Sequence, residues 1–177
     1  MLEPDPIPPE PRAEPDRVPT ERLAELVSAA AYGTVLVLAA LSVISVSDVA
    51  LGHGSELVAG VGVATWLAHL FAELLGDHIR RDEPLSAGEI RRAMVDGSPI
   101  LAATVLPALV LLLGRLDLIS ATTARVVSVL VAVIQLVAIG AYVGRVAPGR
   151  SGAPWAFAGV TALVGLLVVV LSVLLGH

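Results

Sequence analysis

Five apolar runs, separated by short polar segments, constrain this 177-residue chain more than any other feature. They occupy residues 27–46, 57–76, 97–114, 126–144 and 153–176. Each is close to the roughly 20 residues that an α-helix needs to cross a bilayer. Spanning backbone must satisfy its own hydrogen bonds in lipid, which favours helices over open strands. The sequence therefore predicts an all-α, polytopic membrane protein, with a bundle of five transmembrane helices within residues 23–177.

The composition agrees with this class. Apolar residues make up 56% of the chain and charged residues 15%, and the mean hydropathy of +0.86 lies well outside soluble averages. The net charge of -5 comes mainly from a tail and a loop, so nucleic acid is not an expected partner. The absence of cysteine excludes disulfides and thiolate metal ligands. Since no nucleophilic triad, phosphate-binding glycine loop or HExxH motif occurs, we do not expect an enzyme.

The polar segments predict the ends and the orientation of the bundle. Residues 1–22 are acidic and rich in proline, which predicts a disordered tail with a helix starting near Thr20. Ser86 and Glu89 have capping-box spacing, which predicts a short amphipathic helix in the second loop. Nine of the eleven arginines fall on the side of the N-terminus, and only Arg115 and Arg125 fall on the other. The positive-inside rule then predicts a cell (inner) membrane protein with a cytoplasmic N-terminus and an external C-terminus.

The second run, LVAGVGVATWLAHLFAELLG, contains ionisable side chains. His69 and Glu73 lie within it, and Asp77 follows at the same spacing of four, so the three share one face of a helix. Charged groups at membrane depth are costly and usually functional. Imidazole and carboxylates suit divalent zinc, iron, manganese or nickel, and they equally suit a proton relay. We predict that Tyr32, His78 and Gln135 support this site.

Two functions are compatible with this pattern. In the first, the protein is a small transporter that moves a divalent metal ion (iron, manganese or zinc) or protons along the stripe formed by His69, Glu73 and Asp77, with the metal as substrate and no resident cofactor. In the second, the stripe packs helices together in a non-transporting scaffold or accessory protein. Transport requires the stripe to face a hydrated cavity, whereas a scaffold would bury His69 and Glu73 as a tight pair. Small residues, including Gly33, Gly60 and Gly62, predict close helix packing in either case.

The segment ELLGDHIRR resembles the end of the second helix in the vacuolar iron transporter family, with Gly76, Asp77 and His78 at the family's glycine, acid and aromatic positions. VLPALVLLLG, VIQLVAIGAYVGRV and WAFAGVTALVGLLVVVLSVLLG are similar to the last three helices of that family. The chain departs from the family in having no aspartate in its first run, in having Ala72 and Glu73 at the Ser-Met pair, and in lacking a glutamate-rich cytoplasmic segment. The resemblance implies a homodimer with a metal path between helices, and Asp77 as the one matching ligand position.

Overall fold

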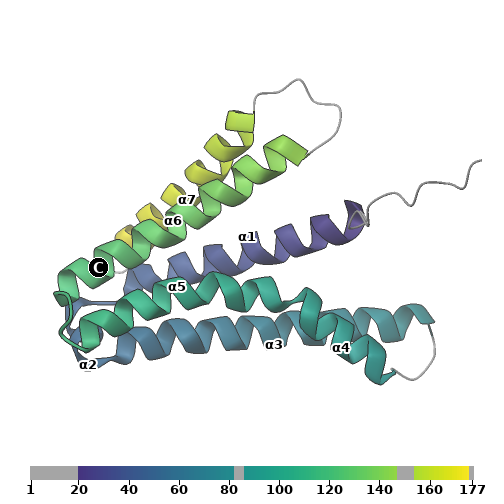
Figure 1. The fold of residues 1–177 in the computed structure, drawn as a ribbon, viewed down its shortest axis with the longest axis horizontal. Helices are drawn as coiled ribbons and strands as arrows, with labels where there is room; N and C mark the ends of the chain where they lie inside the picture. Colours follow the sequence, from purple (N-terminus) through teal and green to yellow (C-terminus); the bar gives the residue numbers. More distant parts are fainter. Residues whose placement is uncertain (1–19, 82–85, 147–153, 176–177) are drawn as a thin grey trace, which may run out of the picture.

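The computed structural model describes residues 20–81, 86–146 and 154–175, which form helices joined by short turns (Figure 1). The helices are α1 (Thr20–Val43), α2 (Val46–Leu51), α3 (His53–Arg81), α4 (Ala87–Asp96), α5 (Ser98–Arg115), α6 (Ala121–Val146) and α7 (Pro154–Leu175). No strand occurs in these three segments, so the all-α prediction is confirmed. The predicted disordered tail falls almost entirely outside the described residues, and α1 begins at Thr20 as expected.

Four helical stretches are long and apolar enough to cross a membrane: Arg22–Val43, His53–Ile79, Ala87–Arg115 and Ala121–Val146. They contain most of the first apolar run and the whole of the next three. The fifth run coincides with α7, whose described apolar stretch, Gly159–Val168, is shorter. The crossing of a membrane by α7 therefore stays a prediction.

The first apolar run ends earlier than predicted because a short helix, α2, follows it. Ser45 caps α2: its hydroxyl accepts a hydrogen bond from the backbone N–H of Asp48 at 3.1 Å. The carboxylate of Asp48 accepts one from the backbone N–H of Ser45 at 2.9 Å. This reciprocal pair starts a new helix at Val46, so residues 44–46 do not continue α1. Gly52 then ends α2 with φ of 86°, a conformation that glycine adopts without strain.

The short helix predicted in the second loop is confirmed as α4. The backbone N–H of Glu89 donates to the Ser86 hydroxyl at 3.3 Å, and the Glu89 carboxylate accepts from the backbone N–H of Ser86 at 2.8 Å. Only Gly97 separates α4 from α5. Figure 1 shows that the chain bends at this junction, so that α4 points away from the line of α5.

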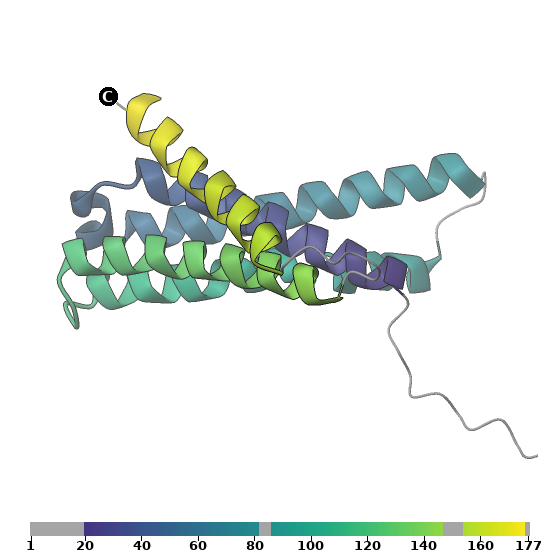
Figure 2. The ribbon, with the colours of Figure 1, turned by 90° about the horizontal axis from the view of Figure 1, so that it is seen from above.

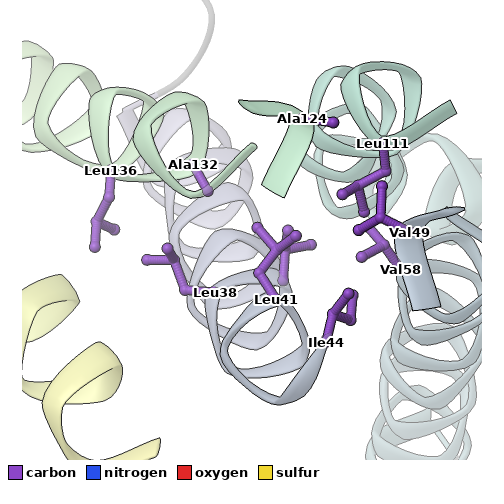
Figure 3. Close-up of a cluster of buried hydrophobic side chains, with 10 residues drawn as sticks. Leu38, Leu41, Ile44, Val49, Val58, Leu111, Ala124, Ala132 and Leu136 are labelled. Atoms are coloured by element: carbon purple, nitrogen blue, oxygen red, sulfur yellow. The ribbon is translucent and has the colours of Figure 1, made fainter. Parts of the chain in front are cut away.

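Helix α1 is the centre of the bundle and contacts α3, α5, α6 and α7. Figure 2 shows α3 and α6 on opposite sides of it. The core lies in the half of the bundle next to α2, where Leu38 and Leu41 of α1 are fully buried (Figure 3). The other large side chains of this core are Val37, Ile44, Val49, Val58, Leu111 and Leu136.

Two of the predicted small residues mark close approaches between helices. A Cβ added to Gly33 of α1 would lie 2.9 Å from the Cα of Ile100 in α5. One added to Gly62 of α3 would lie 2.8 Å from the Cβ of Thr104, also in α5. A Cβ on Gly60, in contrast, would have no neighbour within 4 Å. Small residues thus allow α1 and α3 to pack closely on α5, whereas Gly60 plays no such role among the described residues.

Candidate functional site

A cleft of about 770 Å³ opens between α1 and α3, at the end of the bundle farthest from α2. We call it the α1–α3 cleft. It is lined by Ala24, Glu25, Ser28, Ala29 and Tyr32 of α1, Ala68, His69, Ala72 and Glu73 of α3, and Asp96 of α4. Four of the nine lining residues from these two helices are alanines, which are too small to fill the space between the helices. The cleft is therefore a direct result of small side chains at this end of the helix pair.

His69 and Glu73 are one turn apart on α3, and both are half-buried in the cleft. The Oε2 atom of Glu73 is buried and has no hydrogen-bond partner. Within the described part of the chain, no hydrogen bond joins the two side chains. The tight pair expected for a pure packing role is therefore not formed in this geometry, and Glu73 retains a free acceptor.

The turn between α4 and α5 lies close to His69. A Cβ added to Gly97 would lie 3.3 Å from Cδ2 of His69 and 3.1 Å from Cδ1 of Trp66, so the missing side chain lets the backbone pass close to both rings. The indole N–H of Trp66 donates to the carbonyl of Met94 at 3.3 Å. His69 is thus held at the level where α5 begins.

Two further acids reach the cleft from other helices, and the sequence analysis missed both. Glu25 comes from the first turns of α1 and Asp96 from the end of α4. Asp96 is only 7% exposed and accepts a hydrogen bond from the guanidinium of Arg22 at 3.1 Å. The available signal was the antiparallel order of consecutive helices, which places the start of α1 beside the end of α3. Three carboxylates, those of Glu25, Glu73 and Asp96, therefore line this end of the cleft.

The predicted site residues are only partly brought together. Tyr32 lines the cleft with His69 and Glu73, although its side chain is 55% exposed. Asp77 lies one turn farther along α3, outside the lining, and His78 is exposed. Gln135 lies on α6, away from the cleft, with a buried and unpartnered Oε1 atom. Its support of the stripe stays a prediction.

The positions of the histidine and acidic side chains also indicate how a metal ion could bind. Among the described residues, no group of three or more histidine, aspartate or glutamate side chains could hold a metal ion. His69, Glu73 and Asp77 follow one another along α3 and do not converge on one point. Their role as successive ligands or relay groups stays a prediction.

A scan against protein-family models and searches of curated proteins and of solved structures find no match to this chain. The resemblance to the vacuolar iron transporter family and the homodimer it implies therefore stay predictions. What the fold and the cleft define is a class: an all-α protein with four helices suited to a membrane and an acidic, histidine-containing cleft at one end.

Proposed function

We propose that this chain is an integral membrane protein that takes up cations, protons above all, in the α1–α3 cleft. The observation that carries this proposal is the gathering of His69 and Glu73 with Glu25 and Asp96 around one open space. Imidazole and carboxylate side chains exchange protons near neutral pH when they are adjacent and hydrated. A cleft that admits water between them supplies both conditions.

The distribution of charge supports placing the bundle in a membrane. Helix α5 has 18 residues, or about 27 Å at 1.5 Å per residue, close to the bilayer's hydrocarbon thickness of about 30 Å. Asp96, paired with Arg22, lies just before it, and Arg115, paired with Glu56 at 3.2 Å, ends it. The two ion pairs therefore flank one apolar band.

This placement moves the stripe towards the membrane surface. His69 packs against Gly97, at the start of α5, so it lies at the edge of the apolar band and not at its centre. Glu73 lies one turn, about 6 Å, farther out. By the positive-inside rule this edge faces the cytoplasm. We infer that cations enter the cleft from that side, pass Glu73 and reach His69.

A proton suits the cleft better than a bare metal ion. Glu73 and His69 can each hold one proton without help from a third group. A divalent metal would need several ligands, and the side chains here surround an open space, so the ion would keep water in its coordination shell. Uptake of hydrated iron, manganese or zinc is the second outcome that the experiment distinguishes.

A non-transporting role is the alternative, and one observation favours it. Beyond the cleft, the buried side chains of Val37, Leu41 and Val58 pack in the core towards α2. Passage to the other side would require these residues to separate. A protein that binds cations on one side, or that offers this end of the bundle to a partner protein, would keep them packed.

Flux through proteoliposomes tests the proposal. The full chain is reconstituted with an internal pH dye, and a potassium gradient with valinomycin drives protons inward. We expect the wild type to acidify the lumen faster than empty liposomes do, and Glu73→Gln and His69→Ala to fall to the empty rate. A second assay with an internal metal-sensitive dye and Mn²⁺ outside tests the metal outcome.

Helix α3 offers matched controls. His53→Ala and Glu56→Gln remove the same two functional groups near the opposite end of the helix, outside the cleft. Both controls should transport at the wild-type rate. Equal flux in cleft and control variants would reject the assigned route, and a wild type at the empty rate in both assays would favour the non-transporting alternative.

A further inference from the structure

Helix α4 exposes both apolar and basic side chains. Ile90, Met94 and Val95 are 38%, 42% and 50% exposed, and Arg91 and Arg92 are also exposed. Neither arginine makes an ion pair with any described residue. The helix contacts the bundle through a narrow edge that includes Ala93 and Asp96, which are 2% and 7% exposed. Most of its surface is therefore uncovered by the described residues.

Most of the exposed groups are sorted by type around the helix; the exception is Val95, which lies between Arg91 and Arg92. At 100° per residue, Ile90 and Met94 lie on one face, with Arg91 at its border. Arg92 lies on the side away from this apolar face. An apolar ridge with basic residues beside and behind it is the pattern of a helix that lies in the interface of a membrane.

The position of α4 agrees with this pattern. The stretch Ala87–Arg115 has 29 residues and would be about 43 Å long if straight, which exceeds the hydrocarbon thickness of about 30 Å. The chain bends at Gly97, so α4 leaves the line of α5 at the level of the Arg22–Asp96 ion pair (Figure 1). Trp66, a residue type enriched at membrane interfaces, holds α4 there through the carbonyl of Met94.

We propose that α4 lies in the membrane interface and binds anionic phospholipid headgroups through Arg91 and Arg92, with Ile90 and Met94 inserted towards the acyl chains. Charge complementarity selects the anionic lipid, because Arg91 and Arg92 are exposed and neither forms an ion pair with a described residue. The inference rests on the membrane placement of the bundle and is independent of cation uptake in the cleft.

The test uses the full chain in nanodiscs made of phosphatidylcholine alone or with 30% phosphatidylglycerol. The native chain has no cysteine, so Met94→Cys and Gly88→Cys each accept one nitroxide label. Collision with oxygen, which concentrates in lipid, is compared with collision with a neutral nickel chelate in water. We expect the ratio of oxygen to nickel collisions to be several-fold higher at position 94 than at position 88, and higher still with phosphatidylglycerol.

Removing the charge distinguishes headgroup binding from simple insertion. One arginine near an anionic surface adds roughly a fivefold gain in affinity. The double variant Arg91→Gln and Arg92→Gln should therefore weaken the binding of α4 to the anionic interface roughly 25-fold, and it should abolish the effect of phosphatidylglycerol on the collision ratio. Arg115→Gln, at the other end of the bundle, should leave it unchanged. Equal ratios at positions 94 and 88 in both lipids would overturn the proposal. An effect of phosphatidylglycerol that survives in the double variant would also overturn it. So would a collision ratio at position 94 that is the same with and without phosphatidylglycerol.

Discussion

The two halves of the pairing between α1 and α3 make a useful comparison, because the same two helices behave differently along their length. In the half next to α2, leucine and valine side chains such as Leu41 and Val58 are 0% exposed and fill the interior. In the other half, alanines such as Ala68 and Ala72 leave a cleft of about 770 Å³. The closed half carries the core, and the open half carries His69 and Glu73.

The difference shows how one pair of helices can combine stability with a polar site. A polar group buried without a partner costs free energy, and the cost falls when water reaches it. The open half leaves space beside the half-buried side chains of His69 and Glu73, while the closed half packs without ionisable groups. Gly33 and Gly62 lie between the two halves, and both contact α5. These glycines let α1 and α3 approach α5 closely where the cleft begins.

The largest expected effect comes from adding a side chain at this boundary. Gly62→Leu would place a Cβ 2.8 Å from that of Thr104, so α3 and α5 must separate. Overpacking usually costs about 1–3 kcal/mol, and a clash between helices should reach about 3 kcal/mol in the free energy of unfolding. Reversible unfolding in mixed micelles of detergent and SDS measures this change.

Gly60→Leu is the matched control, since it makes the same substitution two residues away on the same helix, where a Cβ has no neighbour within 4 Å. Both variants gain the same helix propensity, about 1 kcal/mol relative to glycine at most. Gly60→Leu should therefore be neutral or slightly stabilising. Equal stabilities for the two variants would mean that α3 does not approach α5 at Gly62.

The helices were predictable because their signals are local. Apolar runs gave four long helices, and the spacing of Ser86 and Glu89 gave α4. The helix α2 also has a capping box, in Ser45 and Asp48, but it follows an apolar run without a break and was missed. Capping signals identify helices best where the flanking sequence is polar.

The site was harder to predict because its composition depends on tertiary structure. Leu74 and Leu75 extend the apolar run beyond the start of α5, so the sequence placed His69 deeper than its contact with Gly97 indicates. Glu25 and Asp96 enter the cleft only because antiparallel helices and the bend at Gly97 bring them there. No periodicity within a single helix contains that information.

An intermediate effect is expected from the ion pairs at the two ends of the bundle. The Asp96 side chain is 9% exposed and that of Arg22 48%, whereas Glu56 and Arg115 are 63% and 45% exposed. Arg22→Gln leaves a buried carboxylate beside two other acids, and should cost about 1 kcal/mol in the free energy of unfolding. Arg115→Gln should cost no more than about 0.5 kcal/mol.

High salt should separate the effects of the Arg22→Gln and Arg115→Gln substitutions. Raising the ionic strength to about 1 M shortens the Debye length to about 3 Å and should remove most of the effect of Arg115→Gln. The effect of Arg22→Gln should persist in part, because Asp96 is shielded from solvent. If both variants lose their effects equally in salt, the two ends of the bundle do not differ in burial as described.

The smallest expected effect concerns the closed end and its dependence on pH. Hydrogen bonds from the hydroxyl and the backbone N–H of Ser45 to the carboxylate lower the pKa of Asp48 below its ordinary value of 3.8. A carboxyl group whose pKa is lower in the folded state stabilises the fold fully above its unfolded pKa. That contribution is lost as the pH falls through the folded pKa. We therefore expect the amides of α2 to lose protection against hydrogen exchange below about pH 4.

Asp48→Asn isolates this group from the other acids that titrate in the same range. The asparagine side chain keeps an oxygen that can accept from the backbone N–H of Ser45, but it has no charge to lose. After correction for intrinsic exchange rates, the variant should show a few-fold less protection of α2 than the wild type near pH 6, and this difference should shrink as the pH falls through the lowered pKa of Asp48. A wild-type profile that is flat with pH, or one that the variant reproduces, would show that the cap does not depend on ionisation. In that case hydrogen bonding alone would hold α2 at the closed end, and the contrast with the open end would rest on packing.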